Sequence, residues 1–212
     1  MDVILESFEA MEMAALQDGA AKPQGRRKVG NISETGQVTA LVKSAAKGDK
    51  QAFVALIDLN RQTMYATAMA ISQSEADAMD AIQDTILILW EKLDTLRNPK
   101  AFKTWMIRIL TRRCFRMLRN GKREVPSENV EDTTAVDQLT EYLERDEAVD
   151  VQRTLQQLSP DDRLILQLFY FEDMSVRDIA KALSIKSDAV RMRLSRGRKR
   201  FLKQYERGGN LL

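Results

Sequence analysis

The chain has 212 residues, of which 44% are hydrophobic and 30% charged, and its formal net charge is +2. Good helix formers dominate, and nine Gly and four Pro leave little room for a turn-rich β-sandwich, so the composition predicts an all-α protein of one or two domains. Zero histidines and a single cysteine, Cys114, exclude an internal disulfide, a Cys-rich zinc site and the Ser-His and Cys-His nucleophile pairs.

Residues 1–36 precede the regular helical pattern and are expected to form a mostly flexible extension. The spacing of a short amphipathic helix is found at Ile4, Leu5, Phe8, Met11 and Ala15, so a docking helix or a fold-back element is the alternative. The N-terminus opens with an acid and lacks the basic flank of a signal peptide, and no apolar run reaches the length of a membrane span. We therefore expect a cytoplasmic protein with no membrane span.

Apolar residues recur at helical spacing through residues 37–120, the first expected domain. A short leading helix ends at Gly48-Asp49, and a longer helix follows. Ser72 or Ser74 can cap the next helix, and the segment "RNPKAF" separates it from a last one. The residues of this last helix expected to face the core are Trp105, Ile109, Phe115 and Leu118. Three or more helices around one core are predicted.

Charge is distributed in blocks along the chain. The segment Arg108–Arg123 has seven basic residues and no acid, whereas Glu124–Asp150 has ten acids and one base. The segment Lys186–Gln204 has eight basic residues and one acid. This pattern indicates two units that face nucleic acid, joined by an acidic linker at residues 121–140.

Residues 141–212 form the second expected domain, which contains a helix-turn-helix. Ser159, followed by Pro160, can cap one helix, and Ser175 can cap another. Ser184 to Lys186 is then a very short turn, and Ser187 can cap a strongly basic helix. A generic two-helix hairpin is the alternative.

In a helix-turn-helix the second helix enters the major groove, with its first residues nearest the base edges. The residues expected to meet the groove are Lys186, Ser187, Asp188, Ala189, Arg191 and Met192. The residues expected to contact phosphates are Arg193, Arg196, Arg198, Lys199 and Arg200. For a charge run alone, a solvated helix face would be the alternative.

Both halves together resemble bacterial RNA polymerase sigma factors of the extracytoplasmic-function type. The motifs that carry the resemblance are "GDKQAFVALI", "ADAMDAIQDTILILWEKL", "AFKTWMIRIL" and "LSPDDRLILQLFYFEDMSVRDIAKALSIKSDAVRMRLSRGRKRFL". The resemblance implies that residues 37–120 are sigma domain 2, which binds core polymerase and the −10 element, and that residues 141–212 are sigma domain 4, which binds the −35 element. It also implies core RNA polymerase, promoter DNA and an anti-sigma factor as partners, with no catalytic residue, metal or cofactor.

The same resemblance implies roles for individual residues. Those expected to bind the polymerase clamp are Asp80, Gln83 and Asp84, with a solvated helix face as the alternative. Those expected to bind the −10 element are Arg97, Asn98, Lys100, Phe102, Lys103, Arg108, Arg112, Arg113 and Arg116. Aromatic and basic side chains suit single-stranded DNA, because bases stack and phosphates need neutralising. The chain departs from the family where Arg112 and Arg116 replace an Asn and an Asp, and where Ser184 replaces a Gly.

Two other classes of protein remain as alternatives. A stand-alone helix-turn-helix regulator would bind duplex DNA without polymerase. A carboxylate-metal nuclease could use only pairs such as Asp161-Asp162 or Glu172-Asp173, and a helix N-terminus explains the first pair better.

Overall fold

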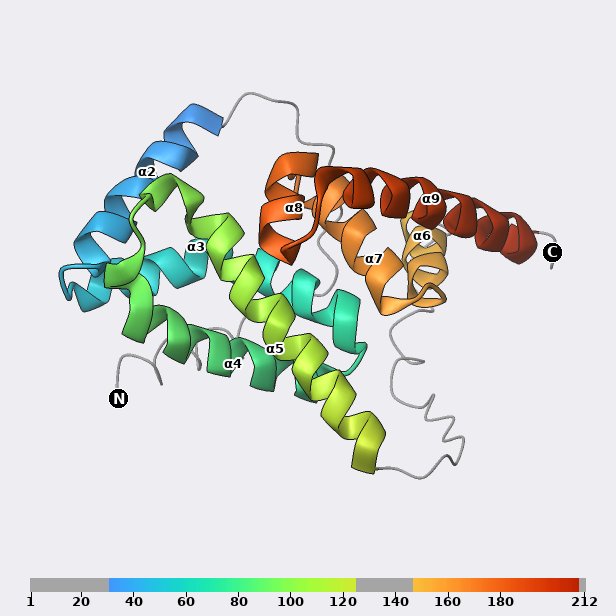
Figure 1. The fold of residues 1–212 in the computed structure, drawn as a ribbon, viewed down its shortest axis with the longest axis horizontal. Coiled ribbons are helices and arrows are strands. Elements are labelled where there is room, and N and C mark those ends of the chain that lie inside the picture. Colours follow the sequence, from blue (N-terminus) through green and yellow to red (C-terminus); the bar gives the residue numbers. More distant parts are fainter. Residues whose placement is uncertain (1–30, 125–146, 210–212) are drawn as a thin grey trace.

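A computed structural model describes residues 31–124 and 147–209, which form helices and no strand (Figure 1). The helices of the first unit are α2 (Asn31–Ala45), α3 (Lys50–Ser72), α4 (Glu75–Lys92) and α5 (Phe102–Glu124). Those of the second are α6 (Glu147–Gln156), α7 (Pro160–Leu166), α8 (Val176–Leu183) and α9 (Ser187–Gly209). The all-α prediction with two helical units is confirmed. The amphipathic pattern near the N-terminus and residues 125–140 of the predicted linker 121–140 lie outside the described residues, whereas residues 121–124 form the end of α5 rather than linker.

Helix α3 is the centre of the first unit and packs against α2, α4 and α5. Its start follows from local chemistry, because the Asp49 carboxylate accepts the Ala52 N–H at 3.0 Å and the Ser44 hydroxyl at 2.8 Å. Gly48 supplies the positive φ of +94° that the preceding turn needs. Ser74 caps α4 by accepting the Asp77 N–H, which decides between the two predicted caps.

Helix α5 buries a different face from the one expected. The fully or nearly buried residues are Phe102, Met106, Ile107, Leu110 and Cys114. The expected core residues Trp105, Ile109, Phe115 and Leu118 are only partly buried against that core. The helix packs on α3 and α4 and also meets α8, so apolar residues occur on more than one side of it. Periodicity alone does not say which apolar side lies deepest.

Helix α9 is the centre of the second unit, because α6, α7 and α8 all pack against it. Ser159 and Ser175 accept the N–H groups of Asp162 and Asp178, so both predicted caps are confirmed. The predicted cap of α9 is one residue off. The Lys186 carbonyl accepts the Val190 N–H at 3.2 Å, which makes Lys186 the cap and Ser187 the first helical residue.

The two units pack directly against each other. Helix α7 and the π-helical turn η4 (Gln167–Phe171) contact α3, and α8 lies beside α5 (Figure 1). Buried apolar residues of both units form one continuous cluster. The unit that contains α5 and the unit that contains the helix-turn-helix therefore meet in this structure, with α8 against α5.

Candidate nucleic-acid interface

Helix α4 presents the residues expected to bind polymerase. Asp80 and Gln83 are exposed, and Asp84 is half-buried. Spacings of three and four residues place them on one side of the helix. Leu87, one turn further on, is 38% exposed, and it was not predicted as part of this surface. The sequence could have indicated this exposure, because Leu87 does not fit the helical spacing of the buried residues Ile82, Ile86 and Leu89.

Asp84 also links this helix to α5. Its carboxylate accepts a hydrogen bond from Arg113 Nε at 2.7 Å and a second one from the same guanidinium. The pair is about one third exposed, so its electrostatic contribution to stability is small. The structure thus brings together one residue predicted to bind polymerase and one predicted to bind DNA. Arg113 points toward α4 rather than toward the other α5 arginines.

The loop between α4 and α5 is shaped by local bonds and two short turns, η1 (Leu93–Thr95) and η2 (Pro99–Ala101). The Asn98 side chain accepts the Lys100 N–H at 3.1 Å and so begins η2. Arg97, Asn98 and Lys100 are exposed, as a DNA contact requires. Phe102 has no exposed surface, so its ring lies in the core and does not form part of the exposed surface of this loop. Its position at the start of α5 turns the ring into the core.

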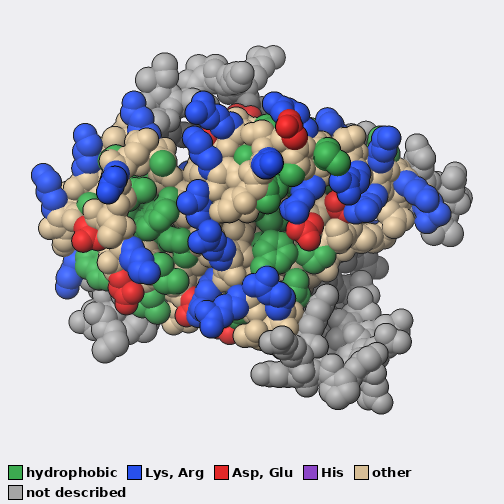
Figure 2. Space-filling model, in the orientation of Figure 1, with side chains coloured by type: hydrophobic (Ala, Val, Ile, Leu, Met, Phe, Trp, Pro, Cys, Tyr) green, Lys and Arg blue, Asp and Glu red, His purple; other side chains and the backbone are tan. Residues whose placement is uncertain are grey.

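Helix α5 carries the remaining basic residues of the predicted −10 surface. Figure 2 shows Lys and Arg side chains gathered down the middle of one face, over α5, and again along α9. Arg112 and Arg116 are exposed, whereas Lys103 and Arg108 are half-buried. Lys103, Arg108 and Arg112 all make polar contacts with the second unit.

The helix-turn-helix predicted at α8 and α9 is present. Ser184 ends α8 in the left-handed conformation with φ 56°, the position where the family commonly has Gly. The Ile185 N–H then bonds to the Ala180 carbonyl at 3.0 Å, and Val190 and Leu194 are buried beneath the turn. This geometry directs the first turn of α9 outward.

The α9 residues expected to reach DNA lie on the surface. Those that are exposed are Lys186, Asp188, Arg191, Met192, Arg196, Arg198, Lys199 and Arg200, while Ser187, Ala189 and Arg193 are half-buried. Gly197 is buried, and a Cβ there would lie 3.6 Å from Leu166. The glycine therefore lets α9 approach α7 closely.

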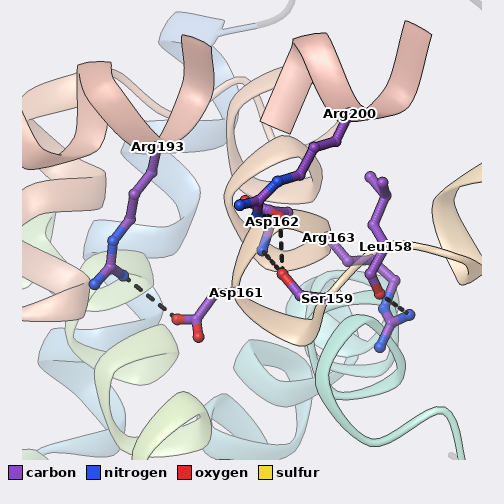
Figure 3. A network of polar contacts seen from close by, with 7 residues as sticks. All are labelled: Leu158, Ser159, Asp161, Asp162, Arg163, Arg193 and Arg200. Carbon is purple, nitrogen blue, oxygen red and sulfur yellow. Dashed lines mark hydrogen bonds and ion pairs between the residues drawn. The ribbon is translucent and has the colours of Figure 1, made fainter. Parts of the chain in front are cut away.

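Two acids at the start of α7 orient arginines of α9 (Figure 3). Asp161 lies 3.4 Å from Arg193, and Asp162 pairs with Arg200 while accepting the Ser159 hydroxyl at 2.8 Å. Asp162 has 7% of its side chain exposed, so this pair is better shielded from solvent than the first. These partners account for the Asp161-Asp162 pair as part of a helix start.

Arg191 has its own acidic neighbour, because it forms an ion pair with Asp188 one turn earlier. Both side chains are largely exposed, so the pair is weak and DNA can compete for Arg191.

The single thiol is not suited to covalent chemistry. Cys114 is buried, and burial raises the pKa of its thiol to about 12. Within the described parts of the chain, no three acidic or thiol side chains gather closely enough to hold a metal ion. Among residues 31–124 and 147–209, no helix combines the length and apolar character that a membrane span requires.

Both halves of the chain match known sequence families. Residues 56–124 match Sigma-70 region 2, and residues 148–201 match Sigma-70, region 4. The RNA polymerase sigma factor NccH of Alcaligenes xylosoxydans xylosoxydans is 32% identical over 168 residues, which cover 75% of this chain and 89% of NccH. The ECF RNA polymerase sigma factor SigM of Mycobacterium tuberculosis is 29% identical over 161 residues, covering 76% of this chain and 81% of SigM.

Two solved structures are also similar. The sigma factor RpoE of Bartonella quintana, solved with the anti-sigma factor NepR, has a TM-score of 0.55 and 26% identity, covering 71% of this chain and 94% of that one. CnrH, solved with the cytosolic domain of CnrY, has a TM-score of 0.60 and covers 80% of this chain and 97% of that one. Its identity of 22% supports the fold alone. The chain belongs to the sigma-70 family of RNA polymerase sigma factors, in its extracytoplasmic-function group.

Proposed function

We propose that three surfaces of this chain divide the work of a sigma factor among α4, α5 and α9. As a sigma factor, the chain binds core RNA polymerase and directs it to promoters to initiate transcription. The observation that carries the assignment of surfaces is their separation. The polar face of α4, the basic side of α5 with its preceding loop, and the basic α9 lie on different helices in the family's order.

The clamp surface, defined as Asp80, Gln83 and Asp84, binds core polymerase. Support comes from the exposure of Asp80 and Gln83 on one side of α4. Leu87 extends this surface by one turn and adds an apolar contact. The core of a protein interface is more apolar than its polar rim, so Leu87 fits such a surface between polar neighbours.

The −10 surface binds the promoter strand that becomes single-stranded on opening. Its residues are Arg97, Asn98, Lys100, Lys103, Arg108, Arg112, Arg113 and Arg116, without the buried Phe102. A groove lined by cations neutralises the phosphates of such a strand. Trp105 is partly buried against the core, which favours a packing role over a stacking one.

The −35 surface is the solvent side of α9 and binds duplex DNA. Its groove-facing residues are Lys186, Ser187, Asp188, Ala189, Arg191 and Met192, and its phosphate contacts are Arg193, Arg196, Arg198, Lys199 and Arg200. Lys186, Asp188, Arg191 and Met192 are exposed at the start of α9, which supports the placement of base-reading residues there.

Several broader features belong to the same proposal. An anti-sigma factor binds the chain, as the anti-sigma factor NepR binds RpoE of Bartonella quintana. The protein works in the cytoplasm, where promoter DNA is, and it supplies recognition while polymerase supplies the bond chemistry. We retain the proposed order of domains, with 37–120 and 141–212 as domains, 1–36 as an extension and 121–140 as a linker. Helix α2 begins at Asn31 and helix α5 ends at Glu124, so the first helical unit reaches a few residues into both flanking segments.

The clamp surface can be tested by direct binding. The double variant Asp80→Arg with Gln83→Ala is expected to weaken the affinity for core polymerase at least tenfold, because it introduces repulsion where an acid is required. Asp58→Arg, an equal charge change at an exposed site of α3, is the matched control and is expected to bind normally. Unchanged affinity of the double variant, with normal helical circular dichroism, would contradict the assignment. Promoter binding that needs no polymerase would instead support a stand-alone regulator.

A further inference from the structure

Three basic residues of the proposed −10 surface are engaged by the second unit of the same chain. Lys103 lies 2.9 Å from the Glu172 carboxylate and also donates to the Glu172 carbonyl at 3.1 Å. Arg108 donates twice to the Lys181 carbonyl, at 2.6 and 3.1 Å. Arg112 donates to the Ser184 hydroxyl at 3.3 Å. The end of α8 and the helix-turn-helix turn therefore occupy positions that DNA phosphates would need.

Glu172 is the acidic centre of this contact. Its side chain is 9% exposed, and it accepts the Thr63 hydroxyl at 2.7 Å in addition to pairing with Lys103. All of these partners lie in the first unit, on α3 and α5. A buried carboxylate needs such partners, because burial without them is costly. Separation of the two units would release Lys103 and hydrate Glu172.

Arg163 forms a second point of contact. It is 5% exposed, and its guanidinium donates to the Ala70 carbonyl at 2.5 Å, the Gln156 carbonyl at 2.9 Å and the Leu158 carbonyl at 3.1 Å. Ala70 lies in the last turn of α3 and Gln156 is the last residue of α6. Each helix C-terminus carries roughly half a negative charge, so two of them together balance about one positive charge.

The contact that Arg163 makes between the two units can also open. Arg163 has no carboxylate partner among the contacts described, one of its terminal nitrogens is buried without a hydrogen-bond partner, and burial lowers the pKa of the guanidinium. Opening of the units removes the α3 terminus and lets water reach the side chain, which recovers part of the lost bonding. Gln73 adds one exposed contact, from its amide to the Gln156 carbonyl at 2.6 Å.

We propose that these contacts form a latch that keeps the free protein closed and self-inhibited toward single-stranded promoter DNA. The latch consists of Thr63, Gln73, Lys103, Arg108, Arg112, Arg163, Glu172 and Ser184. Closure covers part of the −10 surface and leaves Lys186, Asp188, Arg191 and Met192 exposed at the start of α9, so it blocks one DNA contact and spares the other. The inference rests on the proposed function of α5. Binding to core polymerase, or any event that separates the units, frees the α5 cations.

The test uses the full chain with the latch loosened by near-isosteric changes, Thr63→Val together with Glu172→Gln. Asp173→Asn, the same charge change at the next residue, which is exposed, is the matched control. Dyes on Gln51→Cys and Lys203→Cys report the separation of the units by energy transfer. Cys114 is buried and its pKa is raised to about 12, so it does not compete for the dyes. The DNA probes are a labelled oligothymidine strand and a labelled duplex of random sequence.

The latch variant is expected to show lower energy transfer and about tenfold tighter binding of oligothymidine, as the loss of charge-assisted bonds shifts a mostly closed population toward open. Its duplex affinity and helical circular dichroism are expected to match wild type, and the control is expected to change nothing. Gln73→Ala, which removes one exposed contact, is expected to act in the same direction with a smaller effect. Unchanged energy transfer and oligothymidine affinity in both variants would overturn the latch.

A separate variant distinguishes failure of the latch from failure of the proposed function. Arg116 is exposed and lies outside the latch, so Arg116→Ala is expected to weaken oligothymidine binding in closed and loosened proteins alike. If the units separate without a gain in oligothymidine binding, while Arg116→Ala still weakens that binding, closure does not cover the DNA face and the latch inference is wrong. If Arg116→Ala has no effect in either protein, the proposed role of α5 is wrong.

Discussion

Arg163 offers the sharpest test of how a cation is stabilised at the junction of the two units. We expect Arg163→Met to lower the free energy of unfolding by about 3 kcal/mol. The three hydrogen bonds to carbonyls at 2.5, 2.9 and 3.1 Å involve a charged donor. Each such bond contributes about 1.5–3 kcal/mol, which gives a gross loss of about 4.5–9 kcal/mol. Removing a buried cation with one unpartnered nitrogen recovers several kcal/mol of that loss.

Urea unfolding followed by far-UV circular dichroism measures this difference, and an unchanged slope would show that the unfolded reference is the same. Arg153→Met, on the exposed side of α6, is the control and is expected to change stability by less than about 0.5 kcal/mol. Buried charges are sometimes replaced by apolar residues at no cost. A loss below about 1 kcal/mol, or a gain, would therefore refute the view that two helix termini compensate the charge of Arg163.

Three further predictions follow from burial and exposure. Burial raises the pKa of the Cys114 thiol from 9.0 to about 12. The contribution of this thiol to stability is therefore complete below pH 9 and is lost at about 1.4 kcal/mol per pH unit as the pH rises from there toward 12, because the unfolded thiol ionises first. Urea titrations at several pH values should show this slope in wild type and not in Cys114→Ala. Leu87→Asp is expected to weaken core polymerase binding in a pull-down titration, whereas Leu59→Asp, on exposed α3 surface, is not. Arg191→Ala is expected to reduce discrimination between promoter and random duplexes, whereas Arg196→Ala is expected to weaken binding to both duplexes alike. Equal effects of the two variants in a competition assay would show that the base-reading residues are misplaced.

Local chemistry made much of the fold predictable. Ser159 and Ser175 each bond the N–H three residues later, a pattern visible in the sequence because cap and helix are adjacent. The turn at Ser184 and the buried Val190 could be placed for the same reason, since they lie within one short motif. Elements whose partners are near in sequence are therefore the ones that pattern reasoning identifies.

The structure differs from expectation where tertiary packing decides which side of a helix is buried. Phe102 was expected at a DNA surface because of its loop, but it lies at the first position of α5, where its ring enters the core. The buried face of α5 also differs from the predicted one. Trp105 and Ile109 are apolar, but they lie on an adjacent side of the helix and are only partly buried. From the sequence alone, these two residues are as good candidates for the core as the ones that are buried, because the choice depends on the neighbouring helices.

The contact between the units could not be predicted at all. Arg163 and Glu172 are charged residues, and composition alone places such residues on the surface. Their partners, the Ala70 carbonyl and the Thr63 hydroxyl, lie roughly a hundred residues earlier in the chain, at separations of 93 and 109. No periodicity connects residues so far apart. The sequence predicts a linker between the units, but it does not indicate which surfaces of the units meet.

Run-off transcription with reconstituted holoenzyme on genomic fragments tests the central claim most directly. Core polymerase with this chain is expected to produce discrete transcripts from a subset of fragments, and core polymerase alone is expected to produce none of them. The Asp80→Arg with Gln83→Ala variant should lose those transcripts while keeping its helical circular dichroism. Absence of any chain-dependent transcript, with an intact fold and demonstrated binding to core polymerase, would contradict the claim that this chain directs promoter recognition.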